Sequence, residues 1–157
     1  MLEIYTDGAS GPQKVAGWTA WGMAVYRAGA LVLEYSGKLR DRGTPNAAEL
    51  TGFTQALAYC MNQEDPAITI WVDSAYVAQG AAKLAALKDK KFCDEKGRPI
   101  AHQKAWKLVA DFFFEFDLYG RVTVRWVKGH AKVEGNELAD ALAGETSKTG
   151  EPILRKY

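Results

Sequence analysis

The sequence is poor in the residues that cross-link small proteins. Its 157 residues include two cysteines, Cys60 and Cys93, without the spacing of metal ligands. Cys60 falls in an apolar helical pattern and is expected in the core, whereas Cys93 falls in a charged, loop-like stretch. We therefore expect neither a zinc site nor a disulfide framework, and the cysteine content suits a reducing compartment.

Long apolar runs and an excess charge are also lacking. No apolar stretch approaches the roughly 20 residues that span a membrane. The N-terminus enters a strand pattern without a basic-then-apolar signal segment, so we expect a cytoplasmic protein with no membrane partner. The net charge of +1 identifies no partner. With 48% hydrophobic and 25% charged residues, the chain is predicted to form one soluble globular domain.

Hydrophobic periodicity predicts an α/β fold. Apolar and polar residues alternate as in β-strands, and longer segments repeat at helical spacing. The predicted strands are 2–6, 21–26, 31–35, 67–72 and 122–126; the predicted helices follow Pro45-Asn46 and cover 75–87, 103–116 and 134–144. This order predicts a five-stranded mixed sheet with helices on both faces, within one domain covering residues 1–147. Gly150 and Pro152 predict a loose tail over residues 148–157.

Four short motifs each carry a carboxylate. They are Tyr5-Thr6-Asp7-Gly8, Asn46-Ala47-Ala48-Glu49-Leu50, Val72-Asp73-Ser74 and Asn136-Glu137-Leu138-Ala139-Asp140. Two of these acids close strand patterns and two lie in helical patterns, so an α/β fold can bring them to one point. Such close like charges repel unless a cation lies between them, and hard oxygen ligands suit Mg²⁺ or Mn²⁺. Two such ions about 3.5–4 Å apart commonly serve phosphodiester cleavage.

Each acid also has an ordinary interpretation when it is taken alone. Asp73-Ser74 is typical of a helix N-cap. Glu49 lies in the first part of a helix, where an acid interacts favourably with the helix dipole. Asp7 is typical of the turn after a strand. Asp140 is less easily a solvated acid, since small apolar residues flank it. The four acids in this order, in these contexts, favour a catalytic site.

Together with Lys128-Gly129-His130, these motifs resemble type 1 ribonuclease H, from Ile4 to about Glu145. The resemblance implies a ribonuclease H-like fold and cleavage of the RNA strand of RNA–DNA hybrids, giving 5′-phosphate and 3′-hydroxyl ends. It implies two Mg²⁺ ions, with Mn²⁺ as a substitute, and a monomer without an obligate protein partner. It also implies that Asp7, Glu49, Asp73 and Asp140 are the metal ligands, with Asp7 bridging both ions. His130 is implied to assist proton transfer or product release.

Two further segments suit a nucleic-acid backbone. Arg42-Gly43-Thr44 offers a guanidinium, a hydroxyl and backbone N–H groups to a DNA phosphate, as the resemblance implies, and Asn46 is expected to contact the hybrid. From Lys83 to Lys107, seven Lys and one Arg against three acidic residues give a local charge of +5. This predicts a basic, hybrid-binding protrusion with contacts from Lys88, Lys90, Lys91 and Trp106. The alternative is an ordinary solvated face.

Two other functions remain open from the sequence. One is a DNA-cutting or joining nuclease of the same fold, because fold and acids alone do not define the substrate. The other is a non-catalytic hybrid- or RNA-binding module. Four carboxylates argue against the second, because a simple binding protein gains nothing from negative charge that faces phosphates.

Overall fold

The computed structural model describes residues 1–10 and 17–157, and these form an α/β fold around a single mixed sheet. The six strands lie in the order β5-β4-β1-β2-β3-β6. Their bounds are β1 Leu2–Ala9, β2 Ala20–Arg27, β3 Ala30–Lys38, β4 Ile68–Val72, β5 Val122–Trp126 and β6 Ile153–Lys156. The first three strands form the predicted antiparallel meander, and β4 and β5 run parallel to β1.

The sheet topology brings three carboxyl ends to one edge. Strands β1, β4 and β5 are parallel neighbours, so the residues that follow them emerge side by side. Strand β1 lies between β4 and β2, where it is paired along both edges. A central strand with both edges paired is a rigid support for a functional side chain.

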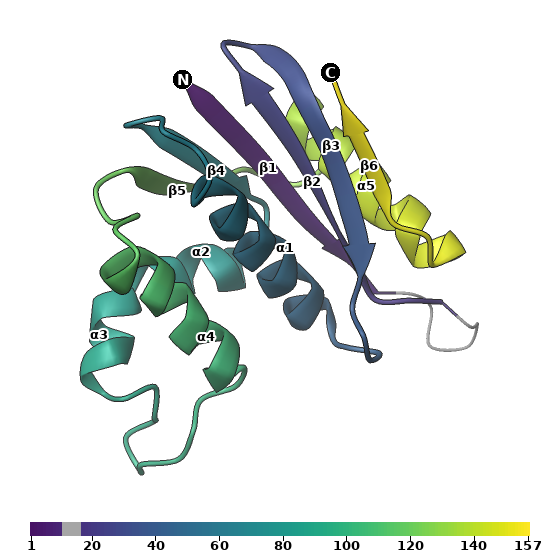
Figure 1. Cartoon of the computed structure of the whole chain (residues 1–157). Coiled ribbons are helices and arrows are strands. Elements are labelled where there is room, and N and C mark those ends of the chain that lie inside the picture. The colour runs from purple at the N-terminus through teal and green to yellow at the C-terminus, as the bar shows by residue number, and fades with distance from the viewer. Residues whose placement is uncertain (11–16) are drawn as a thin grey trace.

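Helices cover both faces of the sheet. Helix α1 (Pro45–Cys60) lies in front of it and α5 (Glu134–Thr149) lies behind it (Figure 1). Four short helical segments lie beside the sheet: α2 (Ala75–Ala82), α3 (Leu84–Asp89), α4 (Gln103–Ala110) and the π-helical segment η1 (Asp111–Glu115). The main core lies between the sheet and α1, where Ile4, Phe53 and Ile70 are fully buried. No helix in the described ranges is long and apolar enough to cross a membrane.

Two predictions about the fold are wrong: the sheet has six strands rather than five, and the tail is not loose. Gly150 takes the left-handed conformation that ends α5 and turns the chain back. Strand β6 then pairs with β3, and the guanidinium of Arg155 bonds the largely buried carboxylate of Glu34 at 2.5 Å. Strand β6 has only four residues, too few for the alternation of polar and apolar residues to predict a strand. It is defined instead by its contacts with β3.

Helix boundaries also differ from the predictions. The helix expected over 75–87 breaks at Lys83, whose backbone lies outside helical geometry, into α2 and α3. The helix expected over 103–116 changes at Asp111 into η1, and α5 continues beyond residue 144 to Thr149.

Candidate active site

Asp7 lies near the end of β1, where its side chain is almost fully buried. The backbone N–H of Gly8 donates to Asp7 Oδ1 at 2.8 Å. A Cβ on Gly8 would lie 2.6 Å from the backbone nitrogen of Glu49, so only glycine allows α1 to approach β1 this closely. The Asp-Gly pair of the first motif therefore supplies both the acid and the space for Glu49.

The four predicted acids meet at this edge of the sheet. Carboxylate oxygens of Asp7, Glu49 and Asp73 lie within 4.8 Å of one another. Asp140, from α5, forms a side-chain hydrogen bond with Asp7. Two strand ends and two helices on opposite faces of the sheet thus supply one cluster.

Burial and mutual repulsion raise the pKa of three of these acids. For Asp7, burial is the largest cause, followed by the hydrogen bond and charge of Glu49. Burial also raises the pKa of Glu49, against an opposing effect of its hydrogen bond to Asp7, and burial raises the pKa of Asp73. The cluster therefore retains protons at pH values where ordinary carboxyls are ionised, unless cations supply the balancing charge.

A second group of side chains lies beside the first. Ligand atoms of His130, Glu137 and Asp140 lie within 4.8 Å of one another, and His130 is exposed on the turn before α5. Its charge also acts on Asp73. Sequence reasoning missed Glu137, although its place three residues before Asp140 puts both on one helix face. This spacing of three residues could have identified Glu137 as a neighbour of the site.

Asp73 is surrounded by the segment from β5 to α5. The indole N–H of Trp126 donates to the backbone carbonyl of Asp73 at 3.1 Å. A Cβ on Gly129 would lie 3.4 Å from Asp73 Oδ2, so the turn that carries His130 packs against this carboxylate. Asn136 forms a side-chain hydrogen bond with Asp73 from the first turn of α5. No sequence pattern assigned a role to Trp126 or Asn136.

This donor set fits hard divalent cations. It is made of carboxylate oxygens, it is partly buried, and its members repel one another when they are ionised. Magnesium and manganese prefer such oxygen ligands, whereas zinc prefers sulfur and nitrogen. Asp7, Glu49, Asp73 and Asp140 would hold the ions.

The predicted phosphate-binding residues lie at the N-terminus of α1, which also carries Glu49. Thr44 caps this helix, its hydroxyl accepting from Ala47 N at 3.1 Å. Arg42, Thr44 and Asn46 are all at least partly exposed. Gly43 is fixed to the start of β2 by two hydrogen bonds with Thr19 Oγ1. A helix N-terminus of this kind favours an anion.

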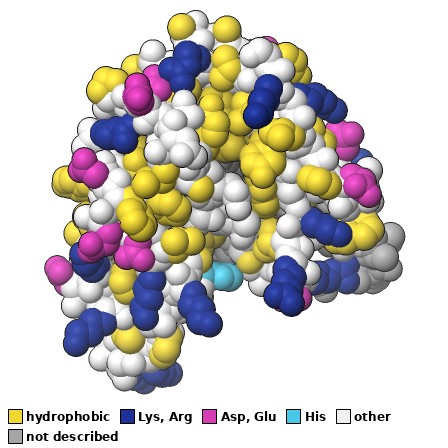
Figure 2. All heavy atoms as spheres, in the orientation of Figure 1, with side chains coloured by type: hydrophobic (Ala, Val, Ile, Leu, Met, Phe, Trp, Pro, Cys, Tyr) yellow, Lys and Arg dark blue, Asp and Glu magenta, His cyan; other side chains and the backbone are white. Residues whose placement is uncertain are grey.

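The predicted basic protrusion is the lobe of α3, α4 and the loop between them, and Lys88, Lys90 and Lys91 are exposed on it. Figure 2 shows Lys and Arg side chains on this lobe and on the facing part of the molecule, with a hollow between them. Lys88 is less available than the other two. Its ammonium lies 3.9 Å from Glu115 and 5.0 Å from the centre of the Phe114 ring.

The prediction that Trp106 contacts substrate is wrong, because its side chain is 2% exposed. Its indole N–H donates to the Tyr76 hydroxyl at 2.9 Å. The ring lies directly against Gly80, where a Cβ would overlap it. Trp106 therefore attaches the lobe to α2 from within. The large apolar ring gains more from burial than from exposure on a charged surface.

Comparisons with known proteins agree with this geometry. The ribonuclease H family model matches residues 1–148. The ribonuclease H of Cyanothece sp. is 31% identical over 157 residues, covering 98% of this chain and 94% of that protein. The ribonuclease H of Paracidovorax citrulli is 36% identical over 144 residues, covering 90% and 91%.

Solved structures give the same result. The solution structure of the PFV RNase H domain matches with a TM-score of 0.78 and 28% identity, covering 93% of both chains. The foamy viral protease-reverse transcriptase in complex with RNA/DNA hybrid matches with a TM-score of 0.82 and 23% identity; the match covers 94% of this chain and 20% of that one, and supports the fold alone.

A mixed sheet with acids at its strand ends defines a nuclease of the ribonuclease H-like class. More particularly, the chain belongs to the ribonuclease H family. It is an enzyme of that family, an endonuclease that hydrolyses phosphodiesters.

Proposed function

We propose that this enzyme cleaves the RNA strand of RNA–DNA hybrids with two Mg²⁺ ions, leaving 5′-phosphate and 3′-hydroxyl ends. The observation that carries the proposal is the convergence of Asp7, Glu49, Asp73 and Asp140 in a chain of the ribonuclease H family. Divalent cations at this cluster would activate the attacking water and stabilise charge on the leaving 3′-oxygen.

The side chains of the protein have separate tasks in this proposal. Asp7, fixed by the Gly8 N–H on a central strand, orients the other ligands. His130 lies on an exposed turn beside Asp140, where an imidazole can carry protons between the leaving group and solvent. Because His130 is exposed, it can exchange its proton with water after each turnover.

In this proposal the enzyme selects hybrids by contacting the RNA strand and the DNA strand at the same time. Asn46 and Glu49 lie within one turn of α1, where they can contact the 2′-hydroxyls that distinguish RNA from DNA. Arg42 and Thr44 precede the same helix and can hold a phosphate of the DNA strand. Double-stranded DNA lacks the first feature. In double-stranded RNA the second strand is also RNA, and we expect its phosphates to fit the site of Arg42 and Thr44 poorly.

The test is cleavage of four matched substrates of one sequence: hybrid, double-stranded DNA, double-stranded RNA and single-stranded RNA, each with Mg²⁺ and with a chelator. We expect Mg²⁺-dependent cleavage of the hybrid alone, in its RNA strand, with 5′-phosphate on the products. Equal cleavage of double-stranded DNA would favour the DNA-nuclease alternative. Hybrid binding without cleavage in any metal would favour the binding module.

Two accompanying properties are part of the proposal. We propose that the enzyme acts as a monomer, because one chain contributes all four acids to the cluster. Light scattering during turnover tests this, and a stable dimer would contradict it. We also propose a cytoplasmic location, which cell fractionation tests.

A further inference from the structure

Asn136 is a buried amide with an unusual environment. Its side chain is 2% exposed, yet it lies in the first turn of α5 beside the acid cluster. Within the described part of the chain, its Oδ1 is one of two buried side-chain oxygens without a hydrogen-bond partner. Leaving a buried acceptor unpaired costs about 1–3 kcal/mol, so an apolar side chain would serve packing better.

The other end of the amide has a partner. The side chain of Asn136 hydrogen-bonds the Asp73 carboxylate, to which an amide can contribute only its N–H₂ group. This bond defines the orientation of the amide, because the reversed orientation would place Oδ1 against a carboxylate oxygen. The unpaired Oδ1 is therefore a consequence of directing the donor at Asp73.

Asp73 depends on contacts of this kind more than Asp7 does. Asp7 is held within β1 by the Gly8 N–H. Asp73 follows the last residue of β4, and its carbonyl is held by the indole of Trp126. That bond restrains the backbone and leaves rotation of the carboxylate free. The Asp73 carboxylate is bonded by the side chains of Asp7 and Asn136. Of these two partners only the Asn136 amide keeps its donor when the acids are ionised.

We infer that Asn136 is a positioning residue, which holds the Asp73 carboxylate in the orientation that shares a divalent cation with Asp7. This inference rests on the proposed metal-dependent function. Groups that orient metal ligands in this way commonly change metal affinity by about 10- to 100-fold when they are removed.

The test is Asn136→Leu, which keeps the approximate shape of the side chain and removes both polar ends. Mn²⁺ binding to the free protein is measured by calorimetry, and Mg²⁺ dependence is measured in hybrid cleavage. We expect Mn²⁺ affinity to fall at least about 10-fold and the Mg²⁺ concentration for half-maximal activity to rise in parallel. The KM for hybrid at saturating Mg²⁺ should change less than about 2-fold, because Asn136 is buried.

Stability measurements separate positioning from packing. Removal of the unpaired acceptor should leave the unfolding midpoint of metal-free Asn136→Leu at or above that of wild type, whereas a packing role predicts a lower midpoint with unchanged Mn²⁺ affinity. Should Asn136→Leu not fold, Asn136→Ser keeps a polar side chain too short to reach Asp73 and should show the same fall in affinity. Asn62→Ala, at an exposed position just after the end of α1, is the matched control and should resemble wild type.

The outcomes distinguish this inference from the proposed function. If wild type binds Mn²⁺ but cleaves no hybrid, the proposed function fails and calorimetry still tests Asn136. If wild type cleaves hybrid and a folded Asn136 variant keeps its Mn²⁺ affinity, the inference alone is overturned.

Discussion

Asp7 interacts with all three other acids of the cluster, so its replacement gives the sharpest test of the site. We predict that Asp7→Asn abolishes cleavage, leaves hybrid binding intact, and unfolds at a higher midpoint than wild type in a chelator at neutral pH. The expected gain is about 1–2 kcal/mol, because an amide is neutral in both the folded and the unfolded chain and so avoids the cost of protonating a buried carboxyl on folding. Circular dichroism and a binding assay measure the two effects, and near-normal cleavage by the purified variant would refute the site.

The pH dependence of that gain has a defined sign. Burial and Glu49 raise the pKa of Asp7 above its value in the unfolded chain. Its protonated form therefore contributes stability below about pH 4, the ordinary range of an aspartate, and this contribution is lost as the pH rises toward the folded-state pKa. The difference between Asp7→Asn and wild type should vanish near pH 4 and grow toward neutrality. Adding Mg²⁺ should then stabilise wild type more than the variant.

His130 has an auxiliary task, so its replacement should slow the reaction without stopping it. We predict that His130→Ala lowers kcat by about 10- to 100-fold at neutral pH. His102→Ala is the matched control, because His102 lies edge-on against Tyr76 at the start of α4 and should leave kcat unchanged. Calorimetry on His130→Ala should show unchanged Mg²⁺ affinity; a large decrease would mean that His130 is itself a metal ligand.

Single residues show where sequence reasoning succeeds and where it stops. Asp7 and Asp73 were predictable as neighbours because each follows an apolar strand pattern, and parallel strands end at one edge. Trp106 was misassigned because an aromatic residue in a basic segment has the same sequence signature whether its ring is buried or exposed. Asn136 could not be predicted, since its role depends on a contact with Asp73 across 63 positions of the chain.

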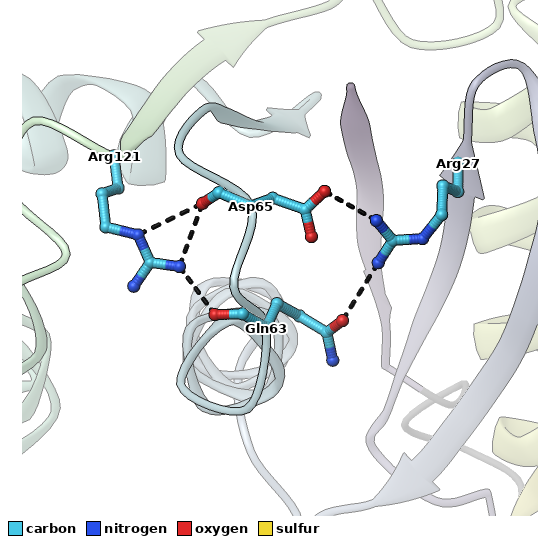
Figure 3. Close-up of polar contacts among 4 residues, drawn as sticks. All are labelled: Arg27, Gln63, Asp65 and Arg121. Carbon is cyan, nitrogen blue, oxygen red and sulfur yellow. Dashed lines mark hydrogen bonds and ion pairs between the residues drawn. The ribbon is translucent and has the colours of Figure 1, made fainter.

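At the scale of elements, one polar cluster fixes the connection between α1 and β4. Arg121, just before β5, donates to the carbonyl oxygens of Gln63 and Asp65 at 2.7–3.2 Å (Figure 3). Arg27, at the end of β2, bonds the side chains of the same two residues. Backbone carbonyls in a connecting segment need such partners, because the segment lies outside the sheet.

We predict that Arg121→Gln lowers the free energy of unfolding by about 1–3 kcal/mol, because it removes three hydrogen bonds from a charged donor to partly buried carbonyls. Arg27→Gln is the comparison and should cost less than about 1 kcal/mol, since its ion pair with Asp65 is more exposed. Urea denaturation measures both. The cluster lies at the opposite end of β4 from Asp73, so both variants should keep wild-type kcat at 25 °C; a fall in kcat would contradict this placement.

Elements were predictable where their periodicity is long and local. The meander and α1 follow directly from alternation and helical spacing, and Asp65-Pro66 marks the end of the helical segment. The break at Lys83 was not predicted, since no proline lies near it and the helical pattern continues through residue 87. Strand β6 is defined by pairing with β3 and by the Glu34–Arg155 contact, and a four-residue pattern cannot reveal either.

At the scale of the whole molecule, a nearly neutral chain carries its positive charge unevenly. The lobe of α3 and α4 faces the α1 end of the molecule across the hollow in Figure 2, and Trp106 fastens it to α2. A hybrid that reaches the acid cluster can therefore contact lysines at a distance from the chemistry. Such contacts add affinity by releasing counterions from the phosphate backbone, and they depend strongly on salt.

We predict that Lys90→Gln with Lys91→Gln weakens hybrid binding and reduces the slope of log affinity against log salt by about 1.4–1.8, since each phosphate that a lysine no longer neutralises lowers the slope by roughly 0.7–0.9. Lys88→Gln should have a smaller effect, because Glu115 and Phe114 already engage its ammonium. Lys156→Gln, on the edge strand β6, is the single-lysine control and should leave the slope unchanged. Titrations of labelled hybrid over a range of salt concentrations measure these slopes.

Since the acid cluster lies outside the lobe, kcat at saturating hybrid should persist in the double variant. A slope equal to that of wild type would mean that the lobe is a solvated face that the hybrid does not reach.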